Sequence, residues 1–400
     1  MSRRVRRAVY GDFGGIGRWI HTNLYCLLSK NNNNRALAAE EKSSQMTRRE
    51  IGIIDSERLK NVPPKFRANH EFCFRLHDQM TSLLVEGEKS GAHLVGIKFT
   101  SASFAEKFAK LDDPLGALLA AGEDKLSRKI ITNHLTVALF SDMLHFIYES
   151  LKALEKRKFS VAFALLRKPL RENLMFATWL KADQADFIRR LKSSPADLME
   201  SRQLSASRRT ELLKSAIENS KGMEFSSAET IYEIIFDKSS QNGFATLFDK
   251  ANHLVTSHRS MRTEELNLNF IFKNPYDNDI YENIYKDLSY VLMYANVLMI
   301  SMYSDMSAME EKYLDYILIT SLGSYSSLFV QGRNKIASEI NKILKEFLHC
   351  PHCGEKLSIN KSNATRFFLT ENINCHCCDG DHHFPFYWLL SKAGFRLKTK

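Results

Sequence analysis

Residues that break helices are scarce in this sequence. Only 17 of its 400 residues are glycine and 8 are proline. Both residues are frequent in the turns between short strands, so their low number excludes a turn-rich β-sandwich. Hydrophobic residues make up 44% of the chain and charged residues 26%, as is usual for a globular protein. We therefore predict a mainly α fold, a multi-helix bundle long enough for two or three compact units.

Long hydrophobic runs are missing as well. A membrane-spanning helix needs about 18 or more consecutive apolar residues. The nearest candidate, residues 290–303, is too short and contains Asn296 and Ser301. The apolar patch at residues 16–28 is interrupted by Arg18, and no small-residue cleavage site follows it. We expect neither a membrane partner nor a secretory signal.

Familiar catalytic signatures are also missing. The chain has no serine elbow, His-Glu-x-x-His motif, Walker loop or kinase signature. Four glycines between residues 11 and 17 are not preceded by an apolar strand, so they do not indicate a phosphate-binding loop. Residues 1–45 lack a helical period, which predicts a disordered basic tail. Met46 opens the more ordinary sequence and is an alternative start.

Positive charge is concentrated at the start of the chain. The formal net charge is +10, and residues 1–50 contain ten Lys or Arg against four Asp or Glu. The rest of the chain therefore carries less than half of the positive excess. Nucleic acid stays a candidate partner, but a body this close to neutral gives little support for a nucleic-acid groove.

Cysteine has the most informative distribution. Cys26 and Cys73 stand alone, whereas the other five of the seven cysteines lie between residues 350 and 378. The motifs CPHCG and CHCC supply two C-x2-C pairs, and two intervening residues let a tight turn present both sulfurs to one metal. We predict a structural zinc ion held by Cys350, Cys353, Cys375 and Cys378. Cys377 is the alternative fourth ligand, because CHCC also contains a C-x-C pair.

The predicted ligand set also indicates a role and a compartment for the zinc. Four thiolates leave no position for water, so the zinc would be structural rather than catalytic. His376, His382 and His383 could donate hydrogen bonds to the thiolates or replace one of them. Metal-bound thiolates need a reducing compartment, which predicts a cytoplasmic protein.

The cysteine-containing segment, residues 346–400, resembles a zinc ribbon. The resemblance depends on CPHCG and CHCC and implies a small β module with four cysteine ligands, without catalysis. Residues 356–359 and 366–370 alternate as strands of a hairpin do, and residues 384–388 could add a third strand.

Helical periodicity dominates the rest of the chain. Residues 46–123 are expected to form an N-terminal, mostly helical region, and residues 124–345 a helical core domain. The strongest period covers residues 124–156. Residues 159–180 are apolar on nearly every side, and Pro169 should bend that helix. Residues 193–227 are polar, which predicts a solvent-exposed excursion.

Three segments together resemble the HEPN-like helical families of prokaryotic toxin and anti-phage systems. They are the long helix, LLRKPLREN at residues 165–173 and ANHLVTS at residues 251–257. The resemblance implies a dimeric ribonuclease with an arginine and a histidine four to six residues apart on one helix. Arg128 and His134 fit, the histidine as acid or base and the arginine as a phosphate-stabilising charge. Lys129 departs from the small polar residue often found after the arginine. The alternative is a solvated Arg128 and a His134 that caps a core edge.

A group of polar residues falls in or near the apolar helix at residues 159–180. Unpaired charges there would be costly, so we expect partners from other segments. Glu172 could pair with Lys168, and Arg167 or Arg171 with Asp142, Glu149 or the pair of Asn252 and His253. The set is either a buried network that determines helix register or a pocket for an anionic ligand; it comprises Arg167, Arg171, Glu172, Asn252 and His253.

Two functions remain open from the sequence. The first is a cytoplasmic, RNA-cleaving or RNA-binding component of a prokaryotic defence or toxin system. The second is a non-enzymatic protein-interaction module with a structural zinc ribbon. A homodimer or another protein partner is compatible with either.

Overall fold

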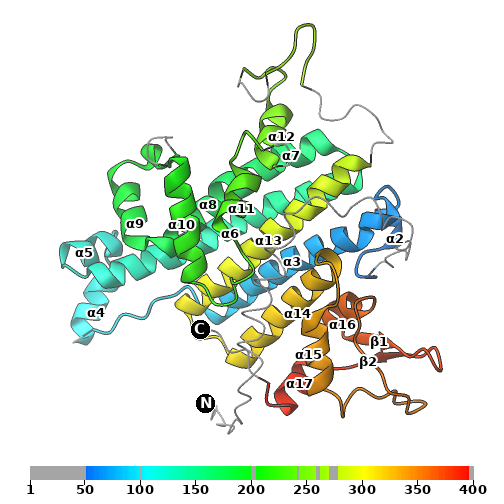
Figure 1. Cartoon of the computed structure of the whole chain (residues 1–400). Helices are drawn as coiled ribbons and strands as arrows, with labels where there is room; N and C mark the ends of the chain where they lie inside the picture. Colours follow the sequence, from blue (N-terminus) through cyan, green and yellow to red (C-terminus); the bar gives the residue numbers. More distant parts are fainter. Residues whose placement is uncertain are drawn as a thin grey trace. The chain divides into compact units, whose positions relative to one another are not determined.

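The computed structural model describes residues 51–99, 101–199, 204–240, 243–257, 262–269 and 278–395. The predicted basic tail, with its glycine cluster and Met46, lies outside these residues. Within them the fold is mainly α, as predicted, with one small sheet of two strands near the C-terminus (Figure 1).

The chain divides into two compact units. The C-terminal unit combines Met1–Arg75 with Met309–Lys400, and the central unit is Leu76–Ala308. The boundary between them falls inside one long helix, α3 (Pro64–Ser90). The sequence predicted domain boundaries at residues 124 and 346. The packing of the helices does not test whether those segments fold independently, so these boundaries stay predictions.

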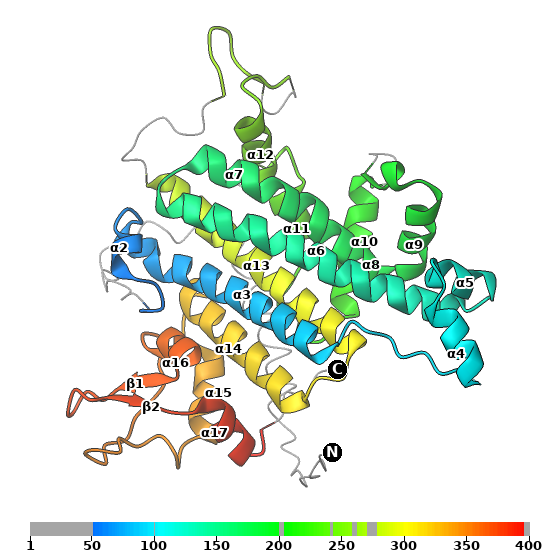
Figure 2. The same ribbon diagram turned by 180° about the vertical axis from the view of Figure 1, so that it is seen from behind.

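The central unit is built around the long helix α6. This helix packs against α7, α8 and α13, and the two views in Figures 1 and 2 agree that α6 and α7 run side by side. The helices of this unit, besides its part of α3, are α4 (Ala102–Ala109), α5 (Pro114–Ala120), α6 (Asp124–Glu155), α7 (Phe159–Lys168), α8 (Leu174–Ala182), α9 (Gln184–Ser193), α10 (Ala206–Glu218), α11 (Ala228–Ile235), α12 (Phe244–Asn252) and α13 (Asp279–Met306). A 3-10 turn, η3 (Pro195–Met199), follows α9.

Helix α13 is the most deeply buried element of the central unit. Its apolar side chains are joined by tyrosines whose hydroxyls find partners on neighbouring helices. The Tyr281 hydroxyl donates to the Leu154 carbonyl at 2.8 Å, and the Tyr294 hydroxyl lies 2.9 Å from Thr178 Oγ1. A buried hydroxyl without a partner would be costly, so these bonds determine how α13 sits against α6 and α8.

The helical stretch at residues 159–182 changes its winding at Pro169, where a bend was predicted. A five-residue π-helical turn, η2 (Pro169–Asn173), joins α7 to α8. Proline has no N–H to donate to the preceding turn, and a wider turn relieves the clash of its ring. Asn173 Nδ2 then donates to the Leu139 carbonyl at 3.1 Å and to Asp142 Oδ2 at 2.8 Å, which ties this turn to α6.

The prediction of a solvent-exposed excursion at residues 193–227 is wrong for α10. This helix packs against α8 and α11 and buries Leu212, Leu213 and Ala216. Its polar residues outnumber these three, but the three lie together on one face. A narrow apolar stripe is enough to dock a helix even when most of its residues are polar.

In the C-terminal unit, helices cover the small sheet and the cysteine loops. Helix α14 packs against α15, α16 and α17, and Gly323 of α14 lies directly against the ring of Phe368. The elements are α2 (Ser56–Leu59), α14 (Glu311–Phe329), α15 (Lys335–Ile343), α16 (Ala364–Thr370), β1 (Asn372–Asn374), β2 (Asp381–His383) and α17 (Phe386–Lys392), with the beginning of α3.

The small β element is present, but its strands are not where the alternation predicted them. Strands β1 and β2 pair antiparallel, with Ile373 opposite His382. Residues 366–370 belong to α16, and residues 386–388 belong to α17. Lys356 forms only an isolated bridge with His349. Five-residue apolar segments fit either period, and packing on α14 selects the helix in both cases.

One described helix is long and apolar enough to cross a membrane when judged by length and composition. This helix is α6. Its most apolar stretch of 18 residues has a mean hydropathy of 1.3, and 33% of that stretch is buried. Core helices of soluble proteins pass the same test. Because α6 packs against five other α-helices, this result is weak evidence for a membrane span.

Candidate metal centre

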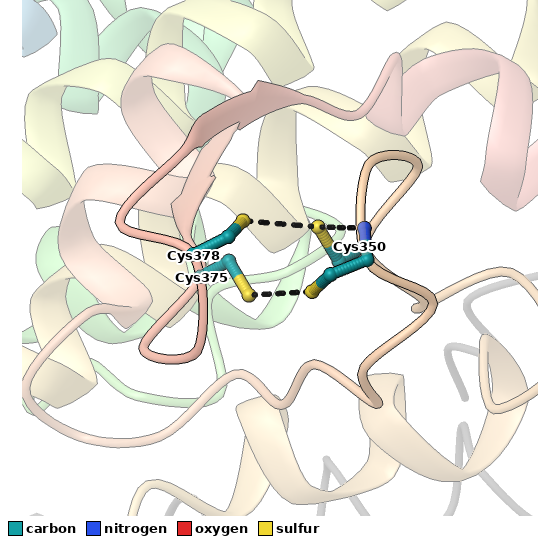
Figure 3. A group of neighbouring side chains, drawn as sticks. Cys350, Cys375 and Cys378 are labelled. Carbon is teal, nitrogen blue, oxygen red and sulfur yellow. Dashed lines mark hydrogen bonds between the residues drawn. The ribbon is translucent and has the colours of Figure 1, made fainter.

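Four cysteine thiols meet between two loops of the C-terminal unit. The sulfur atoms of Cys350, Cys353, Cys375 and Cys378 all lie within 4.8 Å of one another. Cys350 and Cys378 are 3.6 Å apart at Sγ, as are Cys353 and Cys375. Figure 3 shows the side chains converging from the two loops. The structure thus brings together the four predicted ligands in a site that could hold one metal ion.

The first loop folds back so that its amides face the sulfurs. The Cys353 N–H lies 3.4 Å from Cys350 Sγ, and the Gly354 N–H donates to the Cys350 carbonyl at 2.9 Å. Gly354 has a φ of +75°, a conformation that glycine adopts without the clash of a Cβ. Sequence and local geometry agree here, because CPHCG supplies both the spacing and the glycine.

The second loop is the turn of the β1–β2 hairpin. The Cys375 N–H donates to the Gly380 carbonyl at 2.8 Å, which closes the loop that carries Cys378. In this loop Cys377 is exposed, whereas Cys378 is partly buried within the cluster. The geometry therefore places Cys378, and not its neighbour, beside the other three thiols.

The sulfur positions fit a tetrahedral metal. Zinc bound to thiolates at about 2.3 Å requires sulfur atoms about 3.8 Å apart at the corners of a tetrahedron. The two separations of 3.6 Å are close to that edge length. The described residues contain no disulfide among these cysteines, so all four sulfurs are available to a metal.

The surroundings of Cys350 favour the thiolate that a metal requires. Burial alone would raise the pKa of its thiol, but hydrogen bonds from the backbone of Cys353 and His352 lower that pKa to about 6. His382 Nε2 lies 3.0 Å from the same sulfur and can donate a further hydrogen bond to it. The other two candidate histidines lie outside the thiol cluster: His376 is exposed, and His383 Nε2 is 3.7 Å from Glu371.

Arg128 and His134, the predicted catalytic pair, are both exposed on α6. Arg128 Nε donates to the carbonyl of Asp124 in the preceding turn at 3.2 Å. The ring of His134 meets that of His93 edge to face, with 5.8 Å between centroids. Six residues on an α-helix separate two side chains by about 120° around its axis, so the two point in different directions.

The predicted polar group divides into separate contacts. Arg167 Nη1 lies 3.7 Å from Glu172, and Arg171 Nη1 lies 3.5 Å from Asp249. Residues five apart on a regular α-helix lie about 140° apart around its axis, but the π turn between Arg167 and Glu172 widens the helix and brings the two onto one face. Burial, with Asp249 acting in the opposite direction, lowers the pKa of Arg171.

The remaining members of that group, Asn252 and His253, form hydrogen bonds with other residues. Asn252 donates to the Phe248 carbonyl at 2.7 Å, and the exposed His253 accepts a bond from Asn269 at 3.0 Å. Lys168 pairs with Asp142 at 2.7 Å instead of Glu172. A pocket formed by all five residues has no support from these contacts.

A feature that sequence inspection did not single out lies next to the metal loops. Trp388 is 49% exposed and Phe347 is 39% exposed, and their rings meet edge to face at 6.5 Å. Lys392 Nζ lies 5.4 Å from the centroid of the Trp388 ring. The sequence does place a tryptophan near the cysteines, but the pairing with a residue forty-one positions away appears only in three dimensions.

No family model matches the chain, and no curated protein or solved structure matches it either. The HEPN-like resemblance therefore depends only on the residues that suggested it.

Proposed function

We propose that this chain is a zinc-stabilised protein-interaction module of the cytoplasm. The observation that carries the proposal is the exposed pair of Phe347 and Trp388. Large aromatic side chains that share an exposed patch are typical of protein interfaces, where tryptophan contributes a disproportionate part of the binding energy.

A metal at the four cysteines would hold the segments that carry the two aromatic residues together. Phe347 precedes the first ligand, Cys350, by three residues, and Trp388 lies in α17, which follows the second cysteine loop and strand β2. The two segments meet at the cysteines, so the metal links them. Loss of the metal should therefore separate the two rings.

Zinc is the metal that suits this site best. Four soft thiolates in a tetrahedron select zinc or iron, and a site closed by four protein ligands serves structure and not catalysis. Reduced thiols are stable in the cytoplasm, which supports that location.

The charge around the site favours a protein partner over nucleic acid. Residues 344–395 contain five Lys or Arg and five Asp or Glu. Nucleic-acid surfaces depend on a positive excess that neutralises phosphates, and this segment has none. An apolar segment of another protein is the better match for the Phe347 and Trp388 pair.

The metal is tested by elemental analysis of the purified chain and two cysteine variants. We expect about one zinc per chain in the wild type and in Cys377→Ser, and loss of zinc in Cys378→Ser. The two cysteines are neighbours, so they form a matched pair. Zinc loss from Cys377→Ser alone would show that the ligand is Cys377, and iron in place of zinc would overturn the choice of metal.

The interface is tested by photo-crosslinking in cells, with a photoreactive residue in place of Phe347. Exposed Tyr148, in the central unit, is the control position. A partner that crosslinks only at residue 347 is then purified and its affinity measured. We expect Trp388→Ala to weaken binding about 30-fold or more, the loss of a 2 kcal/mol hot spot. Equal affinity for Trp388→Ala would refute the proposal, and a crosslink to a second copy would identify a homodimer.

The second candidate is RNA cleavage at Arg128 and His134 by a HEPN-like component of a defence or toxin system. One observation favours it: His134 is exposed and next to His93, so two imidazoles could share acid and base roles on the surface of α6.

This candidate is tested with labelled single-stranded RNA. Cleavage that falls about 100-fold or more in His134→Ala, but persists in His145→Ala, would support it. His145 is the matched control because it is another exposed histidine of α6. No cleavage by the wild type, with or without the crosslinked partner, would rule it out.

A further inference from the structure

The central unit contains a large cavity that the proposed interface does not use. Its volume is about 1160 Å³, somewhat above the roughly 300–1,000 Å³ of typical small-molecule pockets. It is lined by residues 96–99 and by parts of α4, α5 and α6, together with the ends of α8 and α13.

Apolar side chains form the larger part of the cavity surface. Leu180, Met302 and Met306 line it and are buried, with at most 8% of each exposed. Phe99 and Phe108 also line it, and their rings are 5.1 Å apart. Methionine and phenylalanine present a surface that adapts to flexible hydrocarbon chains.

The uncharged polar side chains on the α6 wall already have partners. Asn133 Nδ2 donates to the His93 carbonyl at 3.1 Å, which anchors the segment before residues 96–99. Thr136 Oγ1 donates to the Thr132 carbonyl at 2.8 Å. Because these groups are satisfied within the protein, they do not require polar groups on a ligand.

Lysines surround the opening. Lys98, Lys107, Lys125 and Lys129 line the cavity and are exposed, and two exposed acids, Glu123 and Asp305, line it as well. None of these four lysines forms an ion pair with another described residue. A fifth lysine, Lys181, is nearly buried and is neutralised by Asp305 at 2.5 Å. Unpaired positive charge therefore lies at the edge, while the interior is neutral.

We propose that this cavity binds a long-chain carboxylate, with the alkyl chain inside and the carboxylate among the four unpaired lysines. An apolar interior beneath a positive edge is complementary to an amphipathic anion and repels a cationic one. The basic start of this chain is a poor occupant for the same reason, since residues 1–50 carry ten Lys or Arg against four acids. The site lies within the central unit and is independent of the metal centre.

The test is displacement of a dansyl-labelled undecanoate from the full-length protein, below the micelle concentration of every ligand. We expect saturable binding that hexadecanoate displaces at least about tenfold better than hexadecanol, because only the acid can engage the lysines. Equal displacement by the acid and the alcohol would overturn the assignment of the carboxylate to the lysines.

Two variants locate the ligand within the cavity. Ala121 lines the cavity and is exposed, so Ala121→Trp fills space without disturbing the core and should abolish binding. The double variant Lys125→Glu with Lys129→Glu should weaken hexadecanoate binding about tenfold and leave hexadecanol unchanged. Both are surface changes, and circular dichroism verifies that they fold.

Lys156→Glu is the matched control, because Lys156 is an exposed lysine at the far end of α6, about 40 Å from Lys129. It should bind hexadecanoate as the wild type does. Wild-type binding by Ala121→Trp, or equal weakening by Lys156→Glu and the double variant, would refute the site. Displacement of the probe by single-stranded RNA but not by hexadecanoate would refute it in favour of a nucleic-acid surface.

Discussion

Replacing Glu71 by glutamine should destabilise the C-terminal unit by about 2–4 kcal/mol. The carboxylate of Glu71, in α3, is completely buried and accepts four backbone N–H groups. Oε2 accepts from Ile51 at 2.6 Å, and Oε1 accepts at 2.8, 2.9 and 3.2 Å from Gly52, Ile53 and Ile54. One side chain thus secures an entire turn of the chain.

The magnitude follows from these four bonds. A hydrogen bond to a charged acceptor contributes about 1.5–3 kcal/mol, roughly twice a neutral one. Glutamine keeps one oxygen for Gly52, Ile53 and Ile54, but its NH₂ group would face the N–H of Ile51, donor against donor. The variant therefore loses one bond outright and the charge in the other three. Desolvation of the carboxylate offsets part of this loss.

The assay is urea denaturation followed by circular dichroism. Glu86→Gln is the control, because Glu86 lies on the same helix but is exposed and pairs only with Lys89 at the surface. It should change the free energy of unfolding by less than about 0.5 kcal/mol. If Glu71→Gln matched this control, the four short bonds would contribute no net stability and the reasoning would be wrong.

Two further changes probe other buried contacts. Burial, opposed by Lys286 and assisted by Glu233, raises the pKa of Asp287 to about 7, so the folded protein holds a proton that the unfolded chain has released. The unfolding free energy should then fall as pH rises from about 4 to 7. Asp287→Asn should flatten that dependence and stabilise the protein above pH 7 by up to about 4 kcal/mol. An unchanged pH profile in thermal denaturation of the variant would contradict this reasoning. Gly323→Ala should destabilise the protein by about 1–3 kcal/mol, because the added Cβ would lie 2.7 Å from Phe368 Cδ2. In a double-mutant cycle, adding Phe368→Leu should restore most of the lost stability. If the stability losses of the two single variants simply added, the two side chains would not clash.

Regular helices were predictable because their signal is local. The period at residues 124–156 matches α6 to within one residue at its C-terminal end, and Pro169 marks the π-helical turn between α7 and α8. In both cases the backbone geometry depends on residues within one or two turns. The local sequence is therefore sufficient to predict both elements.

Short elements near the cysteines were not predictable in the same way. Residues 364–370 and 386–392 form helices because Phe367, Phe368 and Phe386 pack together, with centroids 5.0–5.7 Å apart, and both helices lie against α14. A seven-residue apolar segment carries too few periods to distinguish helix from strand, so its partner decides.

The sequence by itself determined the mainly α fold and the composition of the metal site, because two C-x2-C pairs and a following glycine dictate loops that present four sulfurs. It did not determine which residues at a distance become neighbours. The contact of Phe347 with Trp388, the pairing of Arg167 with Glu172 and the lysine-edged cavity each depend on how helices pack. Packing depends on many weak contacts between segments that are far apart in the chain. Only the tertiary structure shows which segments make these contacts.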